Sequence, residues 1–99
     1  MVKHIIIWSF KEDMTKEEKA FASNKIKTEL EALKGKIDGL IDIKVEVEHL
    51  LSSTGDLLLD SSFESEEALK GYQENPEHLK AANYVRSVVG VRRSFDYEV

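Results

Sequence analysis

Residues 2–10 carry hydrophobic side chains on both sides of an extended chain. One row holds His4, Ile6, Trp8 and Phe10, and the other holds Ile5 and Ile7. This pattern is typical of a strand that is buried on both faces, and residues 57–63 share it. In residues 41–48, apolar and charged side chains alternate strictly, which favours a strand at a sheet edge with one wet face. Residues 91–99 are predicted to form the last strand.

Helical signals separate these strands. Thr15 and Glu18 fit a capping box, and the apolar positions that follow at helical spacing are Ala22, Ile26, Leu30, Leu33 and Ile37. We expect this helix to end near Gly35 or Gly39. A second, short helix is predicted from an N-cap at Ser65 to about Gln73. Asn75 can cap a third helix that begins with Pro76 and stops near Gly90.

The predicted order is β, α, β, β, α in two pieces, β. It indicates an α+β, ferredoxin-like fold with a four-stranded antiparallel sheet and both helical layers on one face. The other face would then lack cover from the same chain and would be an association surface. If the helices cover Ile5 and Ile7, the row from His4 to Phe10 forms that surface. A charge at Trp8 would in that case disrupt a homodimer.

Composition narrows the class of protein. The 99 residues are expected to form one domain, residues 1–99, with a thin core that would gain from a partner. Asp and Glu outnumber Lys and Arg by 19 to 14, and the basic residues are dispersed, which argues against nucleic-acid binding. The chain has no cysteine, and its apolar run at residues 5–8 is too short for a signal peptide or a membrane span. We therefore expect a cytoplasmic protein without a membrane partner.

Several short motifs, taken in order, resemble the stress-responsive A/B barrel (Dabb) family. They are Lys3-His4, Phe63-Glu64-Ser65, Asn75-Pro76-Glu77-His78, Val85-Arg86-Ser87 and Phe95-Asp96-Tyr97. The resemblance spans essentially the whole chain. It implies a homodimer in which two sheets face each other to form a dimeric α/β barrel.

The resemblance also implies candidate site residues. The chain is similar to a plant polyketide cyclase of this family at Tyr72 and His78, which match its proposed catalytic tyrosine and histidine. The positions that match its pocket are His4, Ile6, Trp8, Leu59, Ser61, Arg92 and Ser94. The bulk of Trp8 and the polarity of Arg92 and Ser94 indicate a smaller and more polar pocket, suited to a small polar or anionic molecule. A register shift of one residue would exchange Arg92 for Arg93.

Each candidate also has a structural interpretation. His78 would lie in the first turn of a helix, where the helix dipole favours the neutral imidazole that a general base needs, but it can equally be part of a helix start. Tyr72 can be a packing residue and His4 a hydrogen-bonded core histidine. The three histidines do not have the spacing of metal ligands, and no cofactor motif is present. We therefore expect neither a bound metal nor a cofactor. Three functions stay open, which are small-molecule binding, cofactor-free proton-transfer catalysis of the cyclase type, and a structural dimer.

Overall fold

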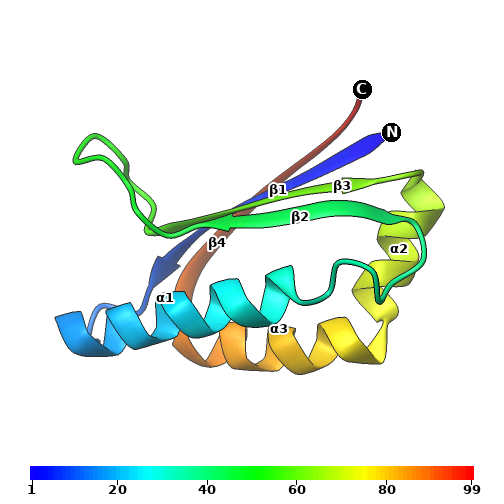
Figure 1. The fold of residues 1–99 in the computed structure, drawn as a ribbon. Coiled ribbons are helices and arrows are strands. Elements are labelled where there is room, and N and C mark those ends of the chain that lie inside the picture. The colour runs from blue at the N-terminus through cyan, green and yellow to red at the C-terminus, as the bar shows by residue number, and fades with distance from the viewer.

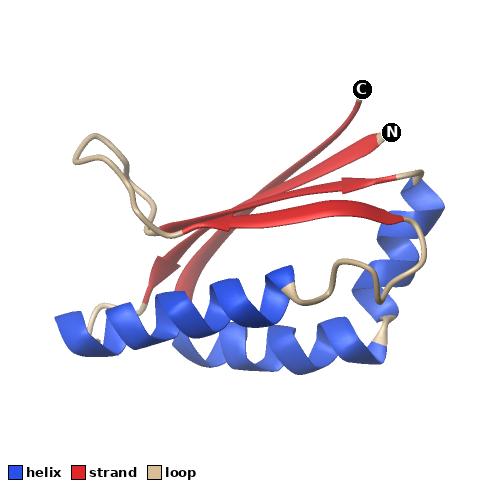
Figure 2. Ribbon diagram, viewed as in Figure 1, coloured by secondary structure: helices blue, strands red, loops and turns tan.

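A computed structural model describes residues 1–99 as one sheet with a helical layer on one side (Figure 1). The elements are β1 Val2–Phe10, α1 Lys16–Glu31, β2 Leu40–Glu46, β3 Leu57–Phe63, α2 Glu66–Glu74, α3 Pro76–Val88 and β4 Val89–Glu98. The strands are all antiparallel in the order β2-β3-β1-β4. The three helices lie on the same side of this sheet (Figure 2). The predicted ferredoxin-like fold is confirmed.

The helix starts follow the predicted caps, but α1 ends early. The Thr15 hydroxyl accepts from the backbone of Glu18, and the Glu18 carboxylate accepts from the backbone of Thr15. The last turn of α1 then tightens, and its C-cap is Ala32 rather than a glycine. Gly35 and Gly39, both with φ above +80°, shape the following turns instead. A β-carbon at Gly39 would also overlap the side chain of Ala68, so only glycine fits there.

The helices cover the opposite face of β1 from the one we expected. Val2, His4, Ile6, Trp8 and Phe10 are buried between the sheet and the helices, whereas Ile7 is 44% exposed on the open face. The prediction that the row from His4 to Phe10 forms the association surface is therefore wrong. Both rows are apolar, so hydrophobicity alone could not assign them to faces.

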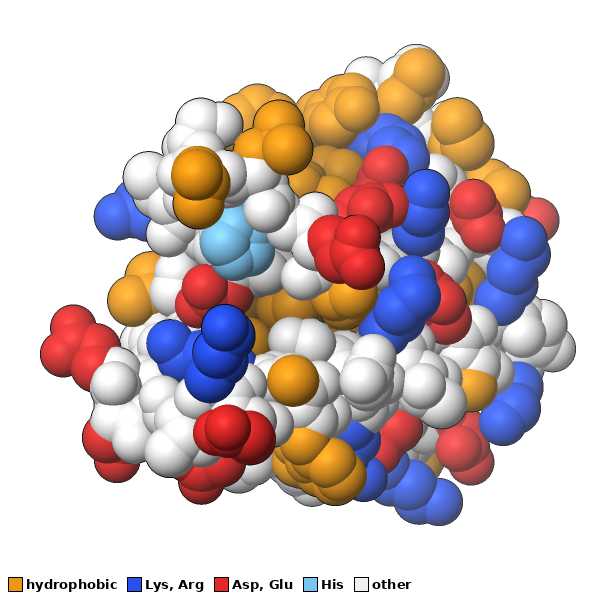
Figure 3. Space-filling model, turned by 60° about the vertical axis from the view of Figure 1, so that its left-hand side comes forward, with side chains coloured by type: hydrophobic (Ala, Val, Ile, Leu, Met, Phe, Trp, Pro, Cys, Tyr) orange, Lys and Arg blue, Asp and Glu red, His pale blue; other side chains and the backbone are white.

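The open face is apolar over β1 and β4 and charged over β2. Its exposed large hydrophobic residues on β1 and β4 are Ile7, Val91, Phe95 and Tyr97. On β2, Asp42, Lys44 and Glu46 point to this side, because Leu40, Ile43 and Val45 are buried. In Figure 3, hydrophobic side chains gather toward the top of the molecule, the side on which the sheet has no helices in Figure 1.

Two apolar side chains, Ile41 and Leu79, lie outside the core. The register between β2 and β3 shifts between Leu40 and Asp42, so Ile41 is 43% exposed although its alternation with charged residues predicted burial. On α3, Leu79 is likewise exposed, and Ala81 and Val85 make the buried contacts of this helix. These local features leave the sheet topology unchanged.

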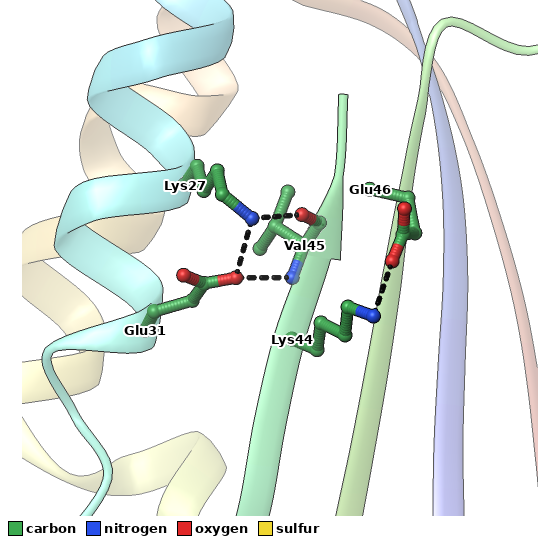
Figure 4. A network of polar contacts seen from close by, with 5 residues as sticks. All are labelled: Lys27, Glu31, Lys44, Val45 and Glu46. Carbon is green, nitrogen blue, oxygen red and sulfur yellow. Dashed lines mark hydrogen bonds and ion pairs between the residues drawn. The ribbon is translucent and has the colours of Figure 1, made fainter. Parts of the chain in front are cut away.

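Two side chains of α1 satisfy the outer edge of β2 (Figure 4). Val45 donates its N–H to the Glu31 carboxylate at 2.9 Å, and its carbonyl accepts from Lys27 Nζ at 2.8 Å. Lys27 and Glu31 also pair with each other at 2.9 Å. The backbone N–H and carbonyl of Val45 point away from the sheet and would have no strand partner, and these two side chains supply their hydrogen bonds.

Glu31→Gln should lower the free energy of unfolding by about 1 kcal/mol near neutral pH, because it removes a partly exposed charge that receives two hydrogen bonds. Burial raises the pKa of Glu31, but the hydrogen bonds from Val45 and Lys27 outweigh it and bring this pKa below 4.5. The stabilisation is therefore present above that pH and is lost as the pH falls through the lowered pKa. Urea unfolding at several pH values measures both effects.

Glu29→Gln is the matched control. Glu29 has a similarly exposed side chain, 34% against 32%, and an equivalent pairing with Lys25, but no hydrogen bond to β2. Equal losses in the two variants would show that the contact with β2 adds no stability.

Candidate functional site

A cavity of about 390 Å³ lies between the sheet and the helices, on the β1 and β4 side. Its size is that of a small-molecule site. Strand β1 contributes His4, Ile6 and Trp8, because these alternate residues point to the helical side. The other lining residues are Leu30, Leu59, Tyr72, Gln73, His78, Ala82, Val85, Arg86, Val89, Gly90 and Arg92.

The junction of α2 and α3 brings Tyr72 and His78 together. Asn75 is the C-cap of α2 and the N-cap of α3; its N–H donates to the Tyr72 carbonyl, and its side chain accepts from the backbone of Glu77. Pro76 follows at the first turn of α3. This tight junction places the rings of Tyr72 and His78, at the two helix ends, 4.1 Å apart between centroids.

Both residues carry a buried polar atom without a hydrogen-bond partner. These atoms are Tyr72 Oη and His78 Nδ1. Burial raises the pKa of Tyr72, so its hydroxyl stays protonated and can donate. Burial also lowers the pKa of His78 below 6.5; the backbone of Gln73 opposes this shift only in part, and His4, Arg86 and Arg92 reinforce it electrostatically. At neutral pH the pair consists of a neutral donor and a neutral imidazole.

A second histidine, His4, lies beside Tyr72 at the cavity wall. His4 is 2% exposed, and its Nδ1 pairs with the Asp96 carboxylate on β4. A carboxylate on Nδ1 holds the proton there and leaves Nε2 as the free ring nitrogen. The His4 ring lies edge-on to Tyr72, with the centroids 6.5 Å apart, and Phe63 packs against Tyr72 at 4.9 Å. His4, Tyr72 and His78 thus form one aromatic cluster with three polar functions.

The structure places most of the predicted site residues around this cavity. His4, Ile6, Trp8, Leu59, Tyr72, His78 and Arg92 line it. Arg92 pairs with Trp8 and Arg93 with Ile7 across β1, so it is Arg92 that lies on the helical side. Ser61 does not line the cavity; it is fully buried, and its hydroxyl donates to the His4 carbonyl. Ser94 shares the face of Ile6 but lies outside the cavity lining.

Sequence reasoning missed Asp96 and Arg86. Asp96 has the same parity along β4 as Arg92 and Ser94, so the strand period alone could have identified it as a neighbour of the cavity. Arg86 lies eight residues after His78 on α3, a spacing that returns to about the same helix face. His49 is exposed on the loop between β2 and β3 and does not line the cavity. No three acidic or histidine side chains are grouped as metal ligands would be.

The fold and this cavity define the class of protein, a ferredoxin-like α+β domain with a small-molecule-sized cavity between sheet and helices and one open sheet face. Residues 2–99 match the model of the stress responsive A/B barrel domain, Dabb. The chain belongs to this family, as its motifs indicated.

Solved structures agree with this assignment. A dimeric protein of unknown function with a ferredoxin-like fold from Bacteroides fragilis is 32% identical, with a TM-score of 0.93 over 99% of this chain and 95% of that chain. A dimeric ferredoxin-like protein of unknown function from Thermobifida fusca is 17% identical, with a TM-score of 0.83 over 99% and 90%. A hydroxynitrile lyase from Passiflora edulis is 14% identical, with a TM-score of 0.79 over 99% and 92%. These last two likenesses concern the fold alone.

No curated protein matches the chain. None of its helices has the length and apolar character needed to span a bilayer.

Proposed function

We propose that this protein is a homodimer whose protomers each bind a small polar or anionic molecule in the cavity between sheet and helices. The observation that carries the proposal is the pair of buried, unpartnered polar atoms at its wall, Tyr72 Oη and His78 Nδ1. A buried polar group without a partner costs about 1–3 kcal/mol, which a ligand that bonds both atoms would recover.

The open face of the sheet supports the homodimer. Ile7, Val91, Phe95 and Tyr97 expose apolar surface that no helix covers. Two copies that bring these faces together would remove this surface from water. The 32% identical Bacteroides fragilis protein is described as dimeric.

A second candidate function is cofactor-free proton transfer next to a carbonyl group. The neutral His78 imidazole would take a proton from the carbon beside the carbonyl, and the Tyr72 hydroxyl would donate a hydrogen bond to the oxygen on which negative charge develops. The lowered pKa of His78 and the raised pKa of Tyr72 favour this division of roles. An aldol-type cyclisation is one reaction that such a pair can serve.

Binding can be tested through the single tryptophan, because Trp8 lines the cavity. We expect small carbonyl compounds from a fragment library to change Trp8 fluorescence in a saturable manner. Ala82→Leu adds bulk at the cavity wall and should weaken each such compound at least about tenfold. Ala20→Leu, at an exposed position of α1, should leave the affinity unchanged.

The binding proposal fails if no fragment alters Trp8 emission. It also fails if the fragments that do so bind the Ala82→Leu and Ala20→Leu variants equally well, since they would then lie outside the cavity.

A further inference from the structure

The two ends of the cavity differ in chemistry. Across the β1 and β4 pair, His4 is opposite Asp96 at one end, and Trp8 is opposite Arg92 at the other. Asp96 and Arg92 are four positions apart along β4, which corresponds to about 13 Å between their α-carbons. Tyr72 and His78 belong to the His4 end, because the Tyr72 ring lies edge-on to His4 and His78 packs against Tyr72.

The Arg92 end carries positive charge that the chain does not neutralise. Arg92 takes part in none of the chain's ion pairs and makes no side-chain hydrogen bond. Arg86, on the facing helix, donates only to the amide oxygen of Asn83 at 2.8 Å. The cavity lining contains no Asp or Glu, and the nearby Asp96 is engaged by His4. An anion would therefore meet two guanidinium groups and no acidic competitor.

The wall between the two ends is apolar. Ile6 and Leu59 form the sheet side, and Ala82 and Val85 form the helix side. A guanidinium group matches the planar, two-oxygen geometry of a carboxylate. A ligand with a carboxylate at Arg92 and a polar group at Tyr72 and His78 would place an apolar spacer along this wall.

From these three observations we propose that the ligand is a small oxo acid. Its carboxylate binds Arg92, with Arg86 close by; a short hydrocarbon spacer lies against Ile6 and Val85; and its ketone meets Tyr72 and His78. This inference rests on the proposed small-molecule function and specifies the ligand's chemical class and its orientation in the cavity.

The test compares three probes with the same seven-carbon acyl chain, which are 6-oxoheptanoate, its methyl ester, and heptanoate. Isothermal titration calorimetry measures their affinities. We expect the oxo acid to bind at least about tenfold more tightly than the ester, which lacks the charge, and than heptanoate, which lacks the ketone. Arg92→Gln should abolish the preference for the acid over the ester, and Arg92→Lys should restore part of it.

Arg93→Gln is the matched control, since Arg93 adjoins Arg92 in sequence but lies on the open face. It should keep the full preference. The inference is overturned if acid and ester bind the wild-type protein equally, if Arg92→Gln leaves the preference intact, or if none of the probes binds. The fragment experiment with Trp8 tests the small-molecule function separately. Fragment binding without binding of these probes would therefore overturn the oxo acid proposal alone.

Discussion

Phe95→Glu should convert the protein from a dimer to a folded monomer. Phe95 is 69% exposed in the protomer and lies opposite Ile5 on the open face, beside Tyr97 at a ring distance of 5.9 Å. Burying such a side chain contributes about 2 kcal/mol, and a two-fold symmetric interface counts it twice. The loss of about 4 kcal/mol corresponds to a roughly thousandfold weaker dimer, before any cost of burying the new charge.

Phe21→Glu provides the control for this experiment. Phe21 is exposed to nearly the same extent, 67%, but it lies on α1 in the helical layer. Sedimentation equilibrium should show a dimer for this variant and for the wild type, and a monomer for Phe95→Glu. A wild-type protein that is monomeric at micromolar concentration, or equal dimerisation of both variants, would contradict the proposed interface.

His78→Ala should reduce turnover of a substrate by about 10² to 10⁴, if the protein is an enzyme, because this is the usual contribution of a general base. Tyr72→Phe keeps the ring that packs on Phe63 and removes only the hydroxyl, so it should lower kcat with little effect on thermal stability. The base must be neutral, and burial lowers the pKa of His78. The rate should therefore hold down to a pH below 6.5 and decline only in more acidic solution.

His49→Ala, which changes an exposed loop histidine, should leave the rate unchanged. Full activity of both site variants would move the chemistry to other groups, among which the pair of His4 and Asp96 is the alternative base in the same cavity. A wild-type rate that already falls by half near pH 6.5, the ordinary pKa of histidine, would contradict the role of His78 as the base.

The sequence was sufficient to predict the elements, because each has a local cause. The capping box at Thr15, the N-cap at Ser65 and the Asn75-Pro76 junction all form as predicted. These signals depend on residues within a few positions of each other, and tertiary contacts do not need to be known to interpret them.

The assignment of faces was not predictable from hydrophobicity, since Ile5 and Ile7 are as apolar as Ile6. A weaker signal was present. The row of Ile5 and Ile7 continues into Lys3 and Ser9, whereas the row of Ile6 continues into Val2 and Phe10. The row with polar ends is the one that faces outward, and the longer apolar row meets the helices.

The residues of the candidate site were predictable only where they belong to a family motif, and their contacts with one another were not. Tyr72 and His78 could be named, but their ring contact depends on how two helices meet at Asn75. The partner of His4 depends on the register of β1 against β4, which brings residues 92 positions apart into contact. Pairings at such distance in the sequence are set by the whole sheet.

The contact of Lys27 and Glu31 with Val45 makes the two edges of the sheet unequal as sites where a strand of another molecule could add. Open-ended ribbons of strands, the route to fibrous aggregates, need a receptive strand at both ends of every unit. Here the outer backbone groups of Val45, in the middle of β2, are already bonded, whereas no side chain bonds to the outer backbone groups of β4. Strand addition is therefore disfavoured at β2, and a pair of molecules joined β4 to β4 would present only two such blunted edges, which opposes polymerisation.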